Sequence, residues 1–471
     1  MSELNISQEL LSEKSHPEVR KLWWISLVVQ SAVGFTNGLY LFTYGPYFYE
    51  KLGGTINPST AMLLTTILLG VRQGLVALFE VPTGALADAI GRAHVVILSL
   101  VFRVFFFLFL AVIWLCSTPS VAFAWGLLAS IAFALNYTLF NGAFSAWCVE
   151  TLREKAPHVS YGWLSSRFYS YQFFAYILGG VLAVYLYLLK MPFVGFLIAA
   201  FVSFCMMGYS MTRMKEVRSL HFLNRQQVQL STIVRRVGEI IGKSAQICSR
   251  YPVLFWIVLT FGSYMFLLSI VLYLWPVYFE TKAGSHAHFG RDWILIVVGA
   301  QSLTFLASRL LVKLNQRWSK EGGVNAHLVG FRRIFIAACL ASALVIIGLS
   351  VETLTRSNGL YLFPIAVFVV MFAFGVVAPC FETLINAYIP VAEAQQRTTI
   401  MSAGSMFRSI MILVLAIPSG GTSGATTTIN WAIPATMLLI SAVVANHFIK
   451  REQRAKERME IAVPVTETSK T

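Results

Sequence analysis

Long apolar stretches, separated by short polar turns, make up most of the chain. Each stretch has at least the length of about 20 residues that a helix needs to cross the hydrocarbon of a bilayer. Twelve of them lie near residues 22–44, 60–82, 94–115, 120–147, 163–189, 192–212, 252–279, 292–314, 329–350, 360–388, 398–418 and 428–449. A polar stretch from Arg213 to Arg250 separates the first six from the last six. The pattern predicts an all-α membrane protein with twelve transmembrane helices in two six-helix halves.

The same pattern divides the chain into successive segments. We expect a cytoplasmic N-terminal segment (1–21), an N-terminal six-helix half (22–212), a cytoplasmic linker (213–250), a C-terminal six-helix half (251–450) and a cytoplasmic tail (451–471). Within the linker, apolar residues recur at helical spacing beside basic ones, which is typical of an amphipathic helix on a membrane surface. The first apolar stretch is longer than the core of a signal peptide, so we expect it to remain as a helix.

Two short motifs recur between the predicted halves. The letters PYFYE at Pro46–Glu50 resemble PVYFE at Pro276–Glu280, and CVETL at Cys148–Leu152 resembles CFETL at Cys380–Leu384. The two offsets, 230 and 232 residues, agree with each other. They therefore indicate one internal repeat, of the kind in which two halves are related by an axis along the membrane normal.

Composition and charge fit a membrane protein and indicate its orientation. Charged residues are 12% of the 471 residues, and mean hydropathy is +0.70, whereas soluble domains carry about 25% charged residues. The net charge is +15, and the basic residues gather in loops on one side of the twelve-span arrangement. The positive-inside rule therefore places both termini and the linker in the cytoplasm. We expect a multi-pass protein of a bacterial inner membrane, with no nucleic-acid-binding domain.

A polar turn, GALADAIGRAH at Gly84–His94, joins the second and third apolar stretches. Its spacing, G-x-L-A-D-x-x-G-R, resembles the loop between helices two and three of the major facilitator superfamily of secondary transporters. The resemblance implies a cytoplasmic latch that meets the start of span eleven. The gating residues that it implies are Gly84, Asp88, Gly91, Arg92 and Arg397. A carboxylate such as Asp88 is stabilised near the positive N-terminus of a helix.

Other stretches extend this resemblance over nearly the whole chain. Phe79–Thr83 leads into the turn as in many bacterial drug-efflux-like carriers, and residues 141–152 resemble their fourth span. Asn386, Pro390 and residues 397–402 resemble their link between spans ten and eleven. The glycine pair Gly179–Gly180 fits a small-residue interface between the halves. The resemblance is specific for the superfamily and leaves the substrate open.

Ionisable residues at membrane depth are costly, so each is a functional candidate. The candidates for proton coupling are Glu382, Glu150 and Glu80. Glu382 leads because span ten lines the central cavity of the fold that the resemblance implies, and Arg408 is its candidate partner. The alternative is structural ion pairing, for example between Glu80 and Arg103. The candidates for substrate contact are Asn37, Tyr40, Tyr44, Asn136, Asn141, Tyr264, Tyr273, Arg408 and Arg103.

These observations favour a proton-coupled secondary transporter that moves a small organic solute by alternating access, with export of drugs or metabolites. An excess of buried arginine supports an alternative substrate, an anionic nutrient or a polycarboxylate siderophore. A hypothesis of another class is a non-transporting membrane receptor or scaffold. The absence of HExxH and Walker motifs argues against an enzyme or an ATP-driven pump. We expect no cofactor or metal, a monomer, and only the solute, protons and membrane lipids as partners.

Overall fold

The computed structural model describes residues 17–53, 57–155, 161–215, 246, 250–283, 289–321, 324–355, 362–388, 409–411, 413–414 and 424–462. Within these ranges the chain forms helices and no strand, which confirms the all-α prediction. Eleven of the described helical segments are long and apolar enough to cross a membrane. The predicted span at 398–418 lies outside the described residues, except for residues 409–411 and 413–414, which are helical.

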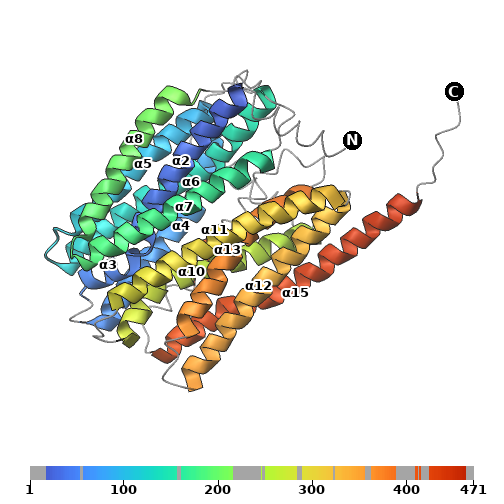
Figure 1. Ribbon diagram of the computed structural model, residues 1–471. Helices are drawn as coiled ribbons and strands as arrows, with labels where there is room; N and C mark the ends of the chain where they lie inside the picture. The colour runs from blue at the N-terminus through green and yellow to red at the C-terminus, as the bar shows by residue number, and fades with distance from the viewer. Residues whose placement is uncertain are drawn as a thin grey trace, which may run out of the picture.

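The helices form two bundles, which we call the N-terminal and C-terminal bundles. The N-terminal bundle contains α2 (Pro17–Leu41), α3 (Tyr44–Lys51), α4 (Pro58–Ile90), α5 (Arg92–Ile113), α6 (Pro119–Lys155), α7 (Tyr161–Leu188) and α8 (Pro192–Arg213). The C-terminal bundle contains α10 (Pro252–Ala283), α11 (Phe289–Glu321), α12 (Val324–Thr355), α13 (Leu362–Tyr388) and α15 (Gly424–Ala462). Helix α2 packs on α7, and α5 packs on α6 and α8; in the other bundle, α12 packs on α13 and α15. Figure 1 shows the two bundles side by side, with the beginning of α2 and the end of α15 toward the same end, which we call the terminal end.

The bundles meet along α7 and α11, and α3 also packs on α10 at the end opposite the terminal end. Among the described residues, α6 has no comparable packing against any helix of the C-terminal bundle. The described contacts therefore join the bundles more extensively along α7 and around α3 than around α6.

The connection between α4 and α5 differs from the predicted turn. Helix α4 continues through Asp88 to Ile90, and α5 begins at Arg92, so Gly91 alone interrupts the helical backbone. The intervening residues, Ala-Leu-Ala-Asp-Ala-Ile, include good helix formers that extend α4. Gly91 has φ of 98°, a conformation that side chains with a Cβ rarely adopt. The tight connection thus depends on one glycine rather than on a polar loop.

Glycines bring α2 and α7 into close contact. A Cβ added to Gly34 would lie 2.2 Å from the Gln172 carbonyl oxygen, and one added to Gly179 would lie 2.0 Å from the Phe35 carbonyl oxygen. Small residues allow this close approach of helix backbones in membranes. Gly179 therefore acts within the N-terminal bundle, whereas Gly180 contacts Val297 of α11 and serves the predicted interface between the halves.

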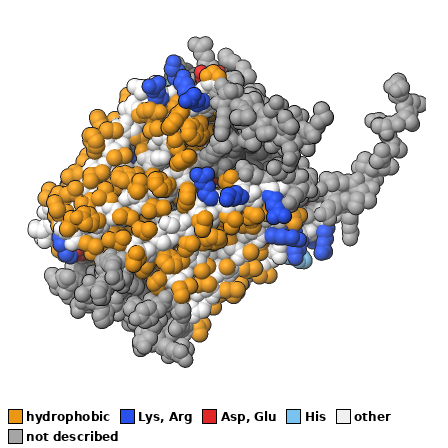
Figure 2. Space-filling model, viewed as in Figure 1, with side chains coloured by type: hydrophobic (Ala, Val, Ile, Leu, Met, Phe, Trp, Pro, Cys, Tyr) orange, Lys and Arg blue, Asp and Glu red, His pale blue; other side chains and the backbone are white. Residues whose placement is uncertain are grey.

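The outer surface is largely apolar. Figure 2 shows hydrophobic side chains over most of the described surface in this view, with most of the visible Lys and Arg toward the terminal end. Large apolar side chains such as Leu78 and Phe201 are 64% and 67% exposed. Such a surface is stable in contact with lipid, and the structure agrees with a multi-pass membrane protein.

Candidate functional site

The predicted gating motif forms an ion pair at the terminal end of the N-terminal bundle. Arg92, in the first turn of α5, places its Nε 3.0 Å from the Glu150 Oε1 of α6. Both side chains are about a quarter exposed, at 23% and 24%. The partner of Arg92 in this pair is thus Glu150, which the sequence had suggested for proton coupling. The pair fastens the beginning of α5 to α6.

Part of the predicted latch cannot be placed. Gly84 and Asp88 lie on the last turns of α4, but the surroundings of Gly84 and the side chain of Asp88 lie outside what the structure describes, as does the whole of Arg397. The latch between Asp88 and span eleven therefore stays a prediction. The side chain of Tyr273, and Arg408 as a whole, likewise lie outside the described residues.

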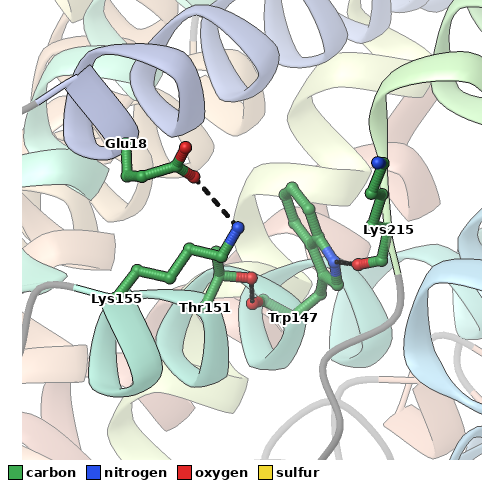
Figure 3. A network of polar contacts seen from close by, with 5 residues as sticks. All are labelled: Glu18, Trp147, Thr151, Lys155 and Lys215. Carbon is green, nitrogen blue, oxygen red and sulfur yellow. Dashed lines mark hydrogen bonds and ion pairs between the residues drawn. The ribbon is translucent and has the colours of Figure 1, made fainter.

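A second polar network, near the Arg92–Glu150 pair, links α2, α6 and the residues directly after α8. Figure 3 shows Lys155 of α6 turned toward Glu18 of α2, with 3.0 Å between Nζ and Oε2. One helical turn earlier, the Thr151 hydroxyl donates to the Trp147 carbonyl oxygen at 2.7 Å. The Trp147 indole in turn donates to the carbonyl oxygen of Lys215 at 2.9 Å. Sequence reasoning missed this network because its partners lie 68 and 137 residues apart.

The terminal end of the C-terminal bundle carries a different network. Arg332 of α12 donates to the side-chain oxygen of Gln453 on α15, and the Tyr388 hydroxyl at the end of α13 lies close to both side chains. Burial raises the pKa of Tyr388 to about 12, against the smaller lowering effects of the nearby Gln453 and Arg332 side chains. Tyr388 therefore remains protonated at physiological pH. The hydrogen bond thus joins α12 to α15, and Tyr388 of α13 lies beside it.

Arg103 lies deep in the N-terminal bundle, where it is 5% exposed. Its Nη2 donates to the Asn37 Oδ1 and the Thr36 hydroxyl at 2.6 Å each and to the Val33 carbonyl oxygen at 3.2 Å. Its Nη1 donates to the Asn136 Oδ1 at 3.2 Å. All of these acceptors are neutral oxygens, which supply the hydrogen bonds that a buried guanidinium requires.

The hypothesised ion pair between Glu80 and Arg103 is wrong. The N–H groups of Arg103 point to acceptors on α2 and α6, and none of its contacts is with Glu80. The two residues have comparable depth along their helices, but depth does not fix the helix face on which a side chain lies. Arg103 joins three helices of one bundle through neutral partners instead.

Arg72 of α4 is the second buried arginine, at 1% exposure. It donates to the Tyr40 hydroxyl, and its Cζ lies 4.7 Å from the ring centre of Tyr44 and 4.5 Å from that of Phe133. A guanidinium over an aromatic face is attracted by the ring quadrupole. Tyr40 and Tyr44, both predicted substrate contacts, are thus packed around a cation.

The remaining predicted contacts have contrasting surroundings. Asn136 is 3% exposed and uses both ends of its amide, because its nitrogen also donates to the Ser99 carbonyl oxygen at 2.9 Å. Tyr264 is fully buried, and its hydroxyl donates to the Val370 carbonyl oxygen at 2.6 Å, which joins α10 to α13. Asn37 is partly exposed, and Asn141 is exposed. Of the described candidates, Asn37 and Asn141 are therefore the accessible ones.

Glu382 of α13 connects the two bundles. Its carboxyl group accepts a hydrogen bond from the Tyr169 hydroxyl of α7, and both residues are partly exposed. Other described contacts between the bundles include a cationic one, in which Arg309 of α11 lies over the Tyr171 ring of α7, and several that are aromatic or neutral. Phe173 and Phe374 meet edge to face with centroids 5.7 Å apart, and the Ser409 hydroxyl lies 3.4 Å from the Gln73 Oε1. Glu382 thus places a titratable group at the boundary between the bundles.

Three solved structures that share this fold are transporters. The D-xylose–proton symporter is 14% identical, with a TM-score of 0.66 over 91% of this chain and 97% of that one. A peptide transporter is 13% identical, with a TM-score of 0.65 over 92% and 95%. The human organic anion transporter is 14% identical, with a TM-score of 0.63 over 91% and 99%. At these identities the similarity shows the fold alone.

No curated protein sequence matches the chain. A family model described as Major Facilitator Superfamily, however, matches residues 26–416, which is most of the chain. Together with the helical architecture, this match indicates a secondary transporter of a small molecule rather than an enzyme. The chain belongs to the major facilitator superfamily.

Proposed function

We propose that the protein is a proton-coupled transporter that moves a small organic solute by alternating access, with Glu382 as the coupling acid. The observation that carries this proposal is the hydrogen bond between Glu382 and Tyr169, because it spans the two bundles. A bond to an ionised carboxylate is stronger than one to a neutral group. Protonation of Glu382 therefore weakens a contact between the bundles and favours their separation at that point.

This arrangement links proton occupancy to conformation. A proton can shift the balance between two conformations only if it binds one of them more tightly than the other. Movement of α7 relative to α13 breaks the contact between Tyr169 and Glu382 and changes the surroundings of the carboxyl group. The proton affinity of Glu382 therefore differs between the two conformations. Because linkage is reciprocal, the conformation that a solute selects also changes the proton affinity of Glu382.

We also propose which end of the protein faces the cytoplasm, on the basis of its basic residues. The terminal end, with Lys and Arg on both bundles, faces the cytoplasm of a bacterial cell under the positive-inside rule. The Arg92–Glu150 pair then lies at the cytoplasmic gate. Among the described residues, α3 packs on α10 at the opposite end and α6 has no comparable packing on the C-terminal bundle, which supports a conformation that opens toward the cytoplasm. We propose a monomer, with the segment boundaries given above.

The favoured transport activity is the export of drugs or metabolites. It is supported by the similarity of Phe79–Thr83 and residues 141–152 to efflux-like carriers. The second candidate is transport of an anionic solute. It is favoured by Arg72 and Arg103, two guanidinium groups that are at most 5% exposed and lie in the same bundle.

Solute-dependent proton movement in proteoliposomes tests the proposal. The purified full-length protein is reconstituted with a pH-sensitive dye inside the vesicles, and a panel of cationic, neutral and anionic solutes is added outside. Transport coupled to protons changes the internal pH for some solutes and not in protein-free vesicles. If solutes cross without any pH change, coupling is refuted. If the protein binds solutes that never cross, the receptor hypothesis replaces the transporter.

A further inference from the structure

The amide of Asn37 has its orientation fixed by a buried cation. A guanidinium has only N–H donors, so the atom of Asn37 that lies 2.6 Å from the Arg103 Nη2 must be the amide oxygen. The identity of the two amide atoms is otherwise ambiguous in protein structures. The amide nitrogen of Asn37 therefore points away from Arg103, as a donor and never as an acceptor.

This nitrogen is available for a ligand. Asn37 is partly exposed, and its nitrogen has no hydrogen-bond partner among the residues that the structure describes. Asn136, the other amide on Arg103, differs because its nitrogen is already occupied by the Ser99 carbonyl oxygen. Of the two amides that Arg103 holds, only Asn37 keeps a donor to offer.

The position of Asn37 on α2 makes this donor face the inside of the protein. Successive residues of a helix are rotated by about 100°. On one side of Asn37 lie Gly34 and Gly38, which pack on α7. On its other side lie Val33 and Thr36, which bond Arg103 of α5. The exposed donor thus lies between two packed faces of α2 rather than on the lipid surface.

The electrostatic surroundings favour a negative group at this donor. The described partners of Arg103 are neutral oxygens, so its charge is not offset by a carboxylate within the described part of the chain. A second guanidinium, Arg72, bonds Tyr40, which follows Asn37 by three residues on α2. Fixed charges of one sign raise the local concentration of ligands of the opposite sign.

We propose that Asn37 is a substrate-contact residue for a carboxylate on the transported solute, and that Arg103 is the positioning residue that holds the Asn37 amide as a donor. This proposal rests on the transport function proposed above and narrows its substrate class. Phe133, partly exposed and 5.9 Å from the Tyr40 ring between centroids, places an aromatic surface nearby. An aromatic carboxylate is therefore the probe that best matches the site.

Asn37→Asp is the critical variant, because it keeps the shape of the side chain and replaces the donor by an acceptor. The new carboxylate lies beside the Arg103 guanidinium and gains an ion pair, so the variant folds and melts at the same or a higher temperature. Asn446→Asp on α15 is the matched control, since Asn446 is partly exposed like Asn37 and lies in the other bundle, away from Arg103. Arg103→Lys keeps the charge but loses the bidentate geometry that fixes the amide.

The measurement is the thermal shift of the purified full-length protein with benzoate, salicylate and phenylacetate, each paired with its methyl ester. We expect carboxylates to stabilise the wild type and the Asn446→Asp control. Asn37→Asp weakens their binding by about 10- to 100-fold, the loss of a hydrogen bond to a charged group. Arg103→Lys weakens carboxylate binding and reduces the preference for carboxylate over ester.

Three results overturn the proposal: no carboxylate stabilises the wild type, the esters act as well as the acids, or Asn37→Asp binds carboxylates normally while remaining folded. The last result leaves Arg103 as a structural link between helices. Because the thermal shift measures binding alone, it is independent of transport. Suppose that the wild type binds carboxylates, that Asn37→Asp abolishes this binding, and that the wild type moves no solute in vesicles. These results would refute the transport function but support the carboxylate site at Asn37.

Discussion

Glu150 and Glu382 occupy equivalent places in the internal repeat, 232 residues apart within CVETL and CFETL, yet they contact different partners. Glu150 pairs with Arg92 inside its own bundle, at the end of the molecule where the two side chains are about a quarter exposed. Glu382 accepts a hydrogen bond from Tyr169 of the opposite bundle. The same motif therefore stabilises one bundle in the first half and connects two bundles in the second.

The difference lies in what each contact does when the bundles move. A pair within one bundle moves as a unit and is the same in every conformation of a rigid-body transition. A bond between bundles is broken or made by the same transition, so its strength biases the balance between conformations. We therefore expect charge changes at Glu382 to alter coupling, and charge changes at Glu150 to alter the local stability of the gate.

The largest effect is expected for Glu382→Gln. Glutamine cannot take up or release a proton, so accumulation driven by a pH gradient falls by more than about 10-fold, while downhill exchange of solute continues. Uptake and exchange in proteoliposomes measure the two quantities. Glu150→Gln is the matched control at the equivalent place of the repeat and retains accumulation. Normal accumulation by Glu382→Gln would remove this residue from the proton pathway.

A smaller effect is expected for Tyr169→Phe, which keeps Glu382 and deletes only the hydroxyl that bonds it. A hydrogen bond to a charged group contributes about 1.5 kcal/mol or more, so coupled uptake changes by about 10-fold. Tyr171→Phe is the control on the same helix, since this half-exposed ring lies beside Arg309 rather than Glu382. If the two substitutions change coupled uptake equally, the bond between the Tyr169 hydroxyl and Glu382 does not contribute to coupling.

Loss of the Arg92–Glu150 pair should have a moderate effect on how often the cytoplasmic gate is open. Partly exposed ion pairs contribute about 0–1 kcal/mol, so Glu150→Gln changes the accessibility of cysteines introduced near the gate by no more than about fivefold. The reversed pair, Arg92→Glu with Glu150→Arg, recovers part of this change. A reversed pair that labels no better than either single variant would contradict direct pairing.

The smallest effect is expected for Glu18→Gln. Glu18 and Lys155 are 40% and 38% exposed, so water and salt screen their attraction. Uptake and the melting temperature should match the wild type within error. A large loss of uptake or a large fall in the melting temperature would mean that the Glu18–Lys155 pair contributes to the gate or to folding, which contradicts this expectation.

The sequence predicted the helical architecture well because each span is a long apolar stretch whose length is set by the bilayer. It predicted the connection at Gly84–His94 less well, because residues 85–90 favour a helix as much as a turn, and only Gly91 has the φ that breaks it. The resemblance to a known loop located the motif but did not fix its backbone.

Partners of buried charges were the weakest predictions. Glu80 and Arg103 have comparable depth, but Arg103 faces α2 and α6 and bonds neutral oxygens there. Arg92 pairs with Glu150, 58 residues away. Which faces of two helices meet is decided by packing, for example by Gly34 and Gly179 between α2 and α7, and no periodicity of one helix reveals it.

The central claim is that protonation of Glu382 is linked to movement of the two bundles. Spin labels at Glu154 of α6 and Arg451 of α15, both exposed at the terminal end, report the separation of the bundles by pulsed electron resonance. The measurement uses a background in which the six native cysteines are replaced by alanine. The account predicts that the distance distribution shifts between acidic and alkaline pH, and that Glu382→Gln holds the acidic distribution at both. A distribution that shifts equally with pH in Glu382→Gln would contradict the claim.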